Sequence, residues 1–226
     1  MEKRRKWMVI LLLLFGLLPH IDAAEKKRVA LTFDDGPCAK STAYLLQGLR
    51  DRGVHATFFL SGYRIDSDPE DALQIASEGH EIGIHGQTHA YFRGIGRERL
   101  EGEILSVGNK IEALTGETPK LARPPGGLMD DQVKQFCKDN DLALILWSVD
   151  PEDWDPKKRA QTASSVVSKA KDGDIILLHD LTTANADQAF AIIDRLKVAG
   201  YEFCTVSELA ESCGKELCCG ESYFRF

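Results

Sequence analysis

The stretch Val29-Ala-Leu-Thr-Phe33, which runs directly into Asp34-Asp35-Gly36-Pro37, carries the pattern that decides the fold. A short apolar run bounded by turn residues is typical of a strand that is buried on both faces of a parallel sheet. The same pattern recurs along the chain. The runs that we expect to form strands are Val29–Phe33, Ala56–Leu60, Glu81–Ile84, Lys120–Ala122, Leu142–Trp147, Asp174–Leu178 and Tyr201–Val206.

Segments with a helical period separate these runs. In the clearest one, Arg97–Leu114, apolar residues follow one another at steps of four and three, which predicts one buried stripe. A glycine closes several helical segments, as expected of a left-handed helix cap. These glycines are Gly53, Gly79, Gly116, Gly173 and Gly200. The repeated order of strand, helix and glycine predicts an α/β protein with a mainly parallel sheet.

Chain length and the number of these units narrow the architecture. A chain of 226 residues suits one domain. About seven strand–helix units favour a single-domain, distorted (β/α) barrel over a full eightfold one. An open doubly wound sheet is the alternative, because periodicity alone does not show whether a sheet closes.

The charge of the chain limits its partners. The formal net charge is −7 at pH 7, and the basic N-terminal segment makes the remainder more acidic still. An acidic surface repels phosphate backbones and anionic lipids. We therefore expect no nucleic-acid partner, and no membrane partner once the N-terminal segment is removed. The oligomeric state stays open, with a monomer expected.

The N-terminus has the features of an export signal. Four basic residues precede the apolar run Trp7–Leu18. This run is shorter than the about 20 residues that span a bilayer, but it suits the core of a signal peptide. We predict that residues 1–24 are a signal peptide and that the protein is secreted, periplasmic or facing the cell envelope. An uncleaved membrane anchor is the alternative.

Six cysteines permit up to three disulfides in an exported chain. Three of them crowd the end of the chain, so we divide it into a domain over residues 25–210 and a Cys-rich tail over residues 211–226. We predict at least one disulfide that involves Cys213, Cys218 or Cys219, with buried free thiols or a metal site as alternatives. The remaining cysteines are Cys38, Cys137 and Cys204.

Ionisable residues follow most of the expected strands. In parallel α/β folds the carboxyl ends of the strands share one face, so these residues are expected around one cavity. They are Asp34, Asp35, His85, His89, Arg123, Asp150, Asp153 and His179, with Trp154 beside them.

Two histidines and an aspartate of this group have the pattern of a metal site. His85-Gly-Gln-Thr-His89 places two imidazoles four residues apart, and Asp34-Asp35 offers a carboxylate. Two histidines and one carboxylate with an open position form a recurrent catalytic zinc set. Adjacent side chains of a strand point to opposite faces, so the Gly36-Pro37 turn would have to rotate both aspartates into the cavity. A solvated turn and surface histidines are the alternative.

The other candidates are interpreted by their surroundings. Arg123 lies in a rigid Arg-Pro-Pro-Gly-Gly segment and suits a fixed partner for a carboxylate, or else a surface charge. Trp154 follows an acidic loop and could form an apolar wall of a substrate groove. Trp147 is expected in the core. His55 and His80 stand at strand beginnings, at the opposite end from the expected cavity.

Between about Arg28 and Leu209 the chain resembles the polysaccharide deacetylases, also called carbohydrate esterase family four, which have a nodulation-factor-deacetylase-like domain. Five motifs carry the resemblance, and they occur in the family's order. They are Thr32-Phe-Asp-Asp-Gly36, His85–His89, Arg123-Pro-Pro, Asp150–Trp154 and Leu177-Leu-His179. Two positions depart from the family: Gly86 stands where Ser or Thr is frequent, and Gly126 where Tyr is frequent.

The resemblance implies a distorted barrel and a metal-dependent hydrolase. Asp35, His85 and His89 would hold a divalent metal, zinc or another such as cobalt. Asp34 would act as the general base, and Arg123 would keep it ionised.

The resemblance also implies the acid and the substrate side. His179 would act as the general acid, held by Asp153, while Pro125, Gly126 and Trp154 would face the substrate. The implied reaction releases acetate from N-acetylglucosamine-type residues of an acetylated glycan, such as peptidoglycan, a chitin-like polymer or an exopolysaccharide. The alternatives are hydrolysis of another amide or of an O-acetyl ester, and a carbohydrate-binding protein without catalysis.

The predicted signal peptide has a direct test. Cleavage near Ala23 or Ala24 should give a protein outside the cytoplasm whose N-terminal sequence begins at about Glu25. Recovery of that protein with Met1 intact would contradict the prediction.

Overall fold

The computed structural model describes residues 26–226, so the predicted signal peptide lies outside the described residues. Within that part of the chain, no helix combines the length and the apolar character that crossing a membrane requires.

Between residues 26 and 226, eight strands form one sheet, and each pairing between neighbouring strands is parallel. Their order is β6-β1-β2-β3-β4-β5-β8, and β7 also pairs with β1. The strands are β1 (Lys27–Asp34), β2 (Thr57–Leu60), β3 (Glu81–Ile84), β4 (Leu121–Ala122), β5 (Ala143–Ile145), β6 (Asp174–His179), β7 (Tyr201–Cys204) and β8 (Ser222–Tyr223). Single bridges from Val149 to Ile176 and from Arg225 to Asp174 close the gap to β6. The predicted distorted (β/α) barrel is confirmed.

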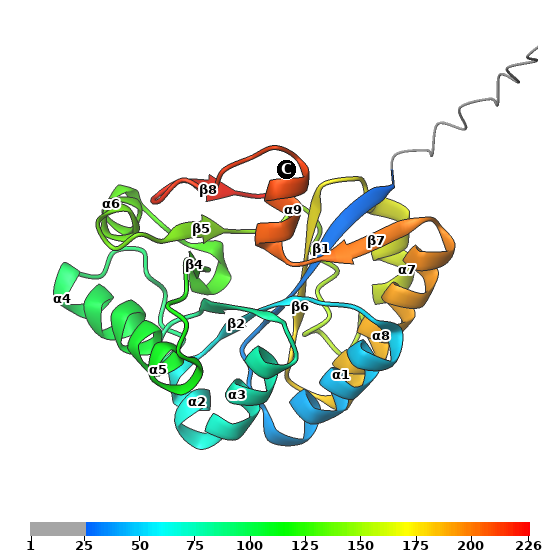
Figure 1. Ribbon diagram of the computed structural model, residues 1–226, viewed down its shortest axis with the longest axis horizontal. Helices are drawn as coiled ribbons and strands as arrows, with labels where there is room; N and C mark the ends of the chain where they lie inside the picture. The colour runs from blue at the N-terminus through cyan, green and yellow to red at the C-terminus, as the bar shows by residue number, and fades with distance from the viewer. Residues whose placement is uncertain (1–25) are drawn as a thin grey trace, which may run out of the picture.

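Helices cover the outside of this curved sheet (Figure 1). They are α1 (Ala39–Arg52), α2 (Gly62–Ser67), α3 (Pro69–Ser77), α4 (Arg97–Leu100), α5 (Ser106–Thr115), α6 (Asp131–Asp139), α7 (Arg159–Lys169), α8 (Thr183–Val198) and α9 (Val206–Ser212). A π-helical turn at Glu101–Leu105 joins α4 to α5, and a short 3₁₀ turn spans Pro125–Gly127. The helix predicted at Arg97–Leu114 is therefore present, but widened in its middle.

The two faces of β1 belong to two different apolar clusters, one between the sheet and the outer helices and one inside the barrel. Val29, Leu31 and Phe33 belong to the large cluster that packs against the outer helices. Ala30 belongs to a second cluster inside the barrel, which also contains residues of β2, β4, β5, β6 and α9. Because side chains alternate along a strand, Asp34 lies on the interior side with Ala30. This alternation is what brings a carboxylate to the inner end of the barrel.

Helix α9 fills the barrel at the end where the strands begin. The Val206 N–H donates to Thr57 Oγ1 at 2.9 Å, and Thr57 is the first residue of β2. A capping box between Thr205 and Glu208 starts the helix at this point. The helix therefore occupies much of this end of the barrel, whereas Asp34 and His179 stand at the opposite end, where their strands finish.

The segment set apart as a tail ends as a strand of this sheet (Figure 1). The Leu146 N–H donates to the Tyr223 carbonyl at 2.7 Å, and the Phe226 N–H donates to the Gly173 carbonyl at 2.9 Å. All six cysteines are unpaired, so the disulfide predicted for the tail is not present in the structure. Main-chain pairing with β5 holds this segment in place of a cross-link.

Removing residues 221–226 should test what β8 contributes. The deletion breaks the bonds to Leu146 and Gly173 and exposes the interior cluster beside Tyr223. We expect the free energy of unfolding to fall by about 2–5 kcal/mol, as measured by urea denaturation. Phe224 is 49% exposed, so Phe224→Ala is the control: it changes a neighbouring aromatic residue and leaves the main-chain pairing of β8 intact. An unchanged midpoint in the truncated protein would contradict this prediction.

Candidate active site

A cavity of about 510 Å³ opens at the carboxyl ends of the strands. Most of the residues that the sequence placed there do meet in it, although they come from distant parts of the chain. Its lining consists of Asp34, Asp35, His85, His89, Tyr91, Gly126, Trp147, Asp150, Trp154, Leu177 and His179.

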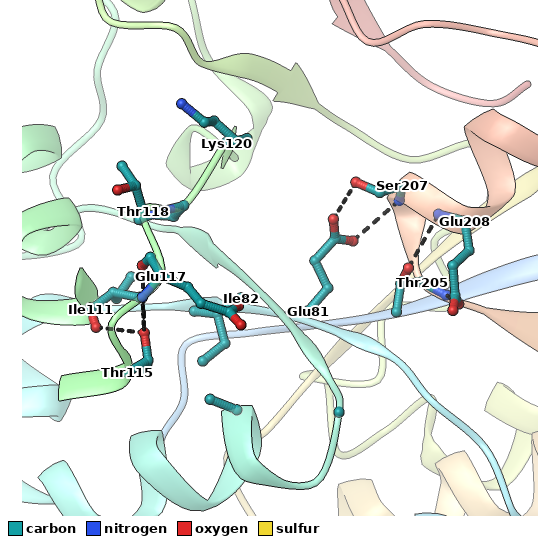
Figure 2. Close-up of a pocket in the computed structure, with 13 residues that line it drawn as sticks. Glu81, Ile82, Ile111, Thr115, Glu117, Thr118, Lys120, Thr205, Ser207 and Glu208 are labelled. Carbon is teal, nitrogen blue, oxygen red and sulfur yellow. Dashed lines mark hydrogen bonds between the residues drawn. The ribbon is translucent and has the colours of Figure 1, made fainter.

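A second cavity, of about 330 Å³, lies at the other end of the strands, beside α9 (Figure 2). Its half-buried carboxylate, Glu81, accepts hydrogen bonds from Thr57 Oγ1 and from the Ser207 N–H and hydroxyl. These bonds satisfy the carboxylate within the fold. Glu81 is therefore engaged in holding α9 to the sheet, unlike the carboxylates at the other end of the strands.

Asp35, His85 and His89 form a compact cluster whose potential ligand atoms all lie within 4.8 Å of one another. The Asp35 Oδ1 atom is 3.5 Å from His85 Nε2 and 3.1 Å from His89 Nε2. The same Oδ1 atom is buried and has no hydrogen-bond partner. A buried carboxylate oxygen without a partner is costly unless a cation pairs with it. The donor set, two imidazoles and one carboxylate, therefore fits a divalent metal such as zinc.

Backbone conformation brings Asp35 and His89 into this cluster. Asp35 has φ +72° and His89 has φ +62°, both in the left-handed region that residues other than glycine rarely adopt. The rotation expected from the Gly36-Pro37 turn is thus already made at Asp35 itself. Such conformations cost about 1–3 kcal/mol each and persist only where the surroundings enforce them.

The protonation states of His85 and Asp35 also suit metal binding, because the pKa of each is lowered. Burial lowers the pKa of His85, which favours the neutral imidazole that a metal needs. His85 Nδ1 lies 2.8 Å from the Arg123 carbonyl oxygen, which can only accept, so Nδ1 carries the proton and Nε2 keeps its lone pair. Burial would raise the pKa of Asp35, but His89, His85 and His179 together lower it below its usual value. Contact with Asp35 in turn raises the pKa of His89.

Asp34 does not belong to this cluster, because Arg123 holds it. Nη1 of Arg123 donates to Asp34 Oδ1 at 2.8 Å and to Thr32 Oγ1 at 2.7 Å. The Arg123 side chain is fully buried, and its other nitrogens donate to the carbonyls of Ile145 and Leu146. The prediction of a carboxylate partner for Arg123 fits this geometry, and the alternative of a surface charge does not.

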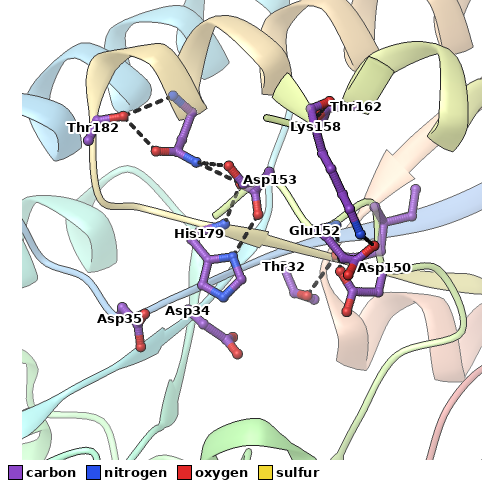
Figure 3. Close-up of polar contacts among 12 residues, drawn as sticks. Thr32, Asp34, Asp35, Asp150, Glu152, Asp153, Lys158, Thr162, His179 and Thr182 are labelled. Carbon is purple, nitrogen blue, oxygen red and sulfur yellow. Dashed lines mark hydrogen bonds and ion pairs between the residues drawn. The ribbon is translucent and has the colours of Figure 1, made fainter. Parts of the chain in front are cut away.

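His179 is held from behind by Asp153 (Figure 3). Its Nδ1 lies 2.7 Å from Asp153 Oδ1, and its backbone N–H donates to Asp153 Oδ2 at 3.0 Å. Asn185 fixes Asp153 in turn, through a 3.0 Å bond from Nδ2 to Oδ2. Burial would lower the pKa of His179, but Asp153, with the more distant charges of Asp34 and Asp35, raises it to about 9. In Figure 3 the imidazole lies between Asp153 and this pair of aspartates.

Comparison with known proteins places the chain in a family. The family model described as polysaccharide deacetylase matches residues 22–145, more than half of the chain. The chain belongs to the polysaccharide deacetylase family.

Three members of this family show how far the similarity extends. A peptidoglycan-N-acetylglucosamine deacetylase of Bacillus cereus is 40% identical over 190 residues, which cover 82% of this chain and 89% of that protein. The peptidoglycan-N-acetylmuramic acid deacetylase PdaC of Bacillus subtilis is 37% identical over 187 residues, 83% of this chain but only 39% of its own length. A family 4 acetyl xylan esterase of Clostridium thermocellum, solved with a cobalt ion, has a TM-score of 0.82 and 32% identity, with 88% of this chain and 98% of that chain covered.

The aromatic side of this deacetylase cavity differs from the sequence expectation. Trp154 is 54% exposed and lines the cavity, whereas Pro125 is buried and does not. Trp147, which we expected in the core, is partly buried and lines the cavity, because it packs against Gly127. Sequence reasoning missed Tyr91, which is 58% exposed.

Tyr91 lies over the position where the deacetylase family often has a tyrosine. Gly126 has φ +62°, and a Cβ atom there would lie 3.2 Å from the Tyr91 ring. The ring therefore takes up space that a side chain at residue 126 would use. The sequence signal for Tyr91 was its place two positions after His89, in a segment that has neither a helical nor a strand period.

Replacing Asp153 should lower the pKa of His179 in this deacetylase domain. In the metal-free protein we expect the pKa of about 9 to fall well below that value in Asp153→Asn, because burial remains while the charge is lost. NMR titration of the imidazole protons measures it, and His80, whose pKa burial lowers to about 4, is the internal control. A His179 pKa that stays near 9 would contradict the prediction.

The stability of the metal-free protein should follow the same titration. The pKa of His179 in the folded protein, about 9, lies above the ordinary value of 6.5, so protonated His179 stabilises the folded state. This contribution to the free energy of unfolding is complete below about pH 6.5 and is lost as the pH rises towards 9. Denaturation in that pH window should therefore show a weaker pH dependence in Asp153→Asn than in the wild-type protein.

Proposed function

We propose that the chain is a metal-dependent hydrolase that removes N-acetyl groups from N-acetylglucosamine-type residues of an extracellular glycan, with peptidoglycan as the favoured substrate. One observation carries the proposal: a cation-binding cluster, a carboxylate paired with a buried arginine, and a histidine paired with a buried aspartate surround one cavity. The names of the Bacillus relatives support the choice of glycan.

The metal is proposed to be zinc, held by Asp35, His85 and His89. When bound, a divalent cation of this kind acidifies water and polarises the acetyl carbonyl. Cobalt suits the same donors, because affinity for such metals is set by ligand type and geometry.

Asp34 is the proposed general base. Arg123 fixes one of its oxygens, Oδ1, while Oδ2 lies 3.6 Å from His85 Nε2, beside the metal cluster. A carboxylate held in this way can take a proton from a water molecule that attacks the acetyl carbon. The backbone N–H at Gly126, on the cavity wall, is the proposed donor to the oxygen that becomes negative.

His179 is the proposed general acid. A deprotonated amine is a poor leaving group, so the sugar nitrogen has to receive a proton as the C–N bond breaks. The contact with Asp153 favours the protonated imidazole at neutral pH, since it raises the pKa of His179 to about 9. Asp153 orients the ring and stays behind it, where it is almost completely buried.

Tyr91 and Trp154 are the proposed sugar-contacting residues. Both rings are more than half exposed at the cavity, with exposed fractions of 58% and 54%. Aromatic rings with this exposure can stack on the apolar faces of sugars. Export of the chain, as the N-terminal segment predicts, would bring this groove to an extracellular glycan.

Hydrolysis of an O-acetyl ester is the second candidate, and the similarity to an acetyl xylan esterase favours it. Acetate release from N-acetylated and O-acetylated glycans, measured side by side, separates the two. Release from esters alone would replace the proposed activity by the second one. Release from neither, with metal bound, would leave carbohydrate binding as the function.

The two neighbouring aspartates should respond differently to substitution. Asp35→Asn removes a charged ligand, so bound metal should fall sharply. Asp34→Asn leaves the three ligands in place, so metal content should stay near one per chain while acetate release falls about a hundredfold or more. Elemental analysis and an acetate assay measure both.

Asp187→Asn, an exposed aspartate on α8, is the matched control for these variants. The reverse pattern would exchange the two roles. Full metal content and full activity in both variants would show that the pair is only a solvated turn.

A further inference from the structure

One acidic side chain, Glu103, is buried against the segment that carries the two histidines. It is 4% exposed. Its Oε2 accepts the Thr88 backbone N–H at 2.8 Å, and its Oε1 accepts the Thr88 hydroxyl at 2.5 Å. A carboxylate is costly to bury, so this two-pronged contact is not an incidental one.

The helix is deformed at the residue that makes this contact. Glu103 lies in the π-helical turn Glu101–Leu105, while Leu100 before it and Val107 after it are completely buried. By spacing, Glu103 shares the inward face with both. A π-turn adds one residue to the turn, and such turns occur frequently at functional sites. Here the widened turn accommodates a charged residue on a face that is otherwise apolar.

The segment from His85 to His89 is held at three successive residues. The carbonyls of Gly86 and Gln87 accept the N–H groups of Gly62 and Tyr63, the first residues of α2, at 2.9 Å each. Glu103 then holds Thr88 with both carboxylate oxygens. The next residue is His89, whose backbone is left-handed and whose Nε2 lies 3.1 Å from Asp35 Oδ1. Thr88 is thus the last fixed point before the metal cluster.

Glu103 also accounts for the glycine at residue 86. Gly86 has φ +92°, and a Cβ atom there would lie 3.2 Å from Glu103 Oε2 and 3.0 Å from the Phe92 ring. The serine or threonine that is frequent in the family at this position would be strained and crowded by that carboxylate. The segment is therefore fixed by a contact from the neighbouring helix, not by a side chain at residue 86.

We propose that Glu103 is a positioning residue that acts through Thr88 to hold His89 in the geometry that metal binding requires. The proposal rests on the metal site of the proposed function. It makes the metal affinity of the protein depend on a side chain that is not itself a ligand.

Two conservative variants test this role. Glu103→Gln keeps the size of the side chain but removes its charge and one of its two acceptors, and Thr88→Val replaces the hydroxyl by a methyl group. We expect each to weaken Co²⁺ and Zn²⁺ binding by about 10–100-fold, the range seen when a residue that orients a ligand is changed. Competition with a chromophoric chelator measures the affinity. Glu112→Gln, at an exposed glutamate of α5, is the matched control and should leave the affinity unchanged.

Urea denaturation of the metal-free variants separates positioning from simple support of the fold. A neutral glutamine is less costly to bury than a carboxylate, so the metal-free Glu103→Gln protein should be as stable as the wild type. The absorption spectrum of the Co²⁺ protein should also change, because the His89 ligand is displaced. Unchanged affinity in both variants would overturn the proposal, as would a loss of affinity that merely follows a loss of metal-free stability.

An acetate assay on the same proteins distinguishes this proposal from the proposed function. If the wild type binds metal but releases no acetate, while the two variants bind metal weakly, the role of Glu103 stands and the proposed reaction fails. If the wild-type protein binds neither metal, the proposal for Glu103 is overturned together with the metal site.

Discussion

The buried ion pair between Asp34 and Arg123 is the contact on which the arrangement of the site depends. The guanidinium is enclosed between the rings of Phe59 and Trp147, at 4.1 and 5.6 Å from their centroids. All three of its nitrogens donate hydrogen bonds, to β1 and to the end of β5. A buried guanidinium that loses its acceptor is costly, so residue 34 has to carry an oxygen that accepts from Arg123. The backbone carbonyl of Arg123 also orients His85. Arg123 thus contacts the Asp34 carboxylate, His85 and the strands β1 and β5. Strand β8 pairs with β5 and so supports the segment whose carbonyls accept hydrogen bonds from the guanidinium.

Most of the strands and most of the residues around the cavity could be predicted, because both depend on patterns that are visible in the sequence. Short apolar runs bounded by turn residues predicted seven of the strands to within a few residues. A strand that is buried on both faces consists mostly of apolar residues, so it shows as such a run. The strand β8 was missed because Ser222–Tyr223 is too short to show any period. The set of residues at the strand ends followed from the parallel topology alone. That His85, His89 and Asp35 meet in space is what this topology predicts.

The parts that could not be predicted depend on backbone conformation and on exposure. Nothing in the letters Asp34-Asp35 shows that only the second residue adopts φ +72°, although this decides which carboxylate joins the histidines. Trp147 borders the cavity although its apolar character pointed to the core, and Tyr91 borders it from a loop that showed no sequence period. Glu103 did leave a signal: a glutamate on the apolar stripe of a helix, three residues after Leu100 and four before Val107. A buried acid in such a place needs a partner, and the partner lies in the histidine segment.

The central position of β1 has a consequence for how the chain acquires its structure. Val29 pairs with Asp174, and Ala30 with Cys204, so the first strand stays without two of its three neighbours until most of the chain has been made. Folds dominated by contacts between distant residues fold slowly compared with those built from local ones. Domains of this topology therefore remain open for a long interval after synthesis begins. Because β7 pairs with β1 and lies close to the end of the chain, β1 cannot gain all of its neighbours before residue 204 has been made.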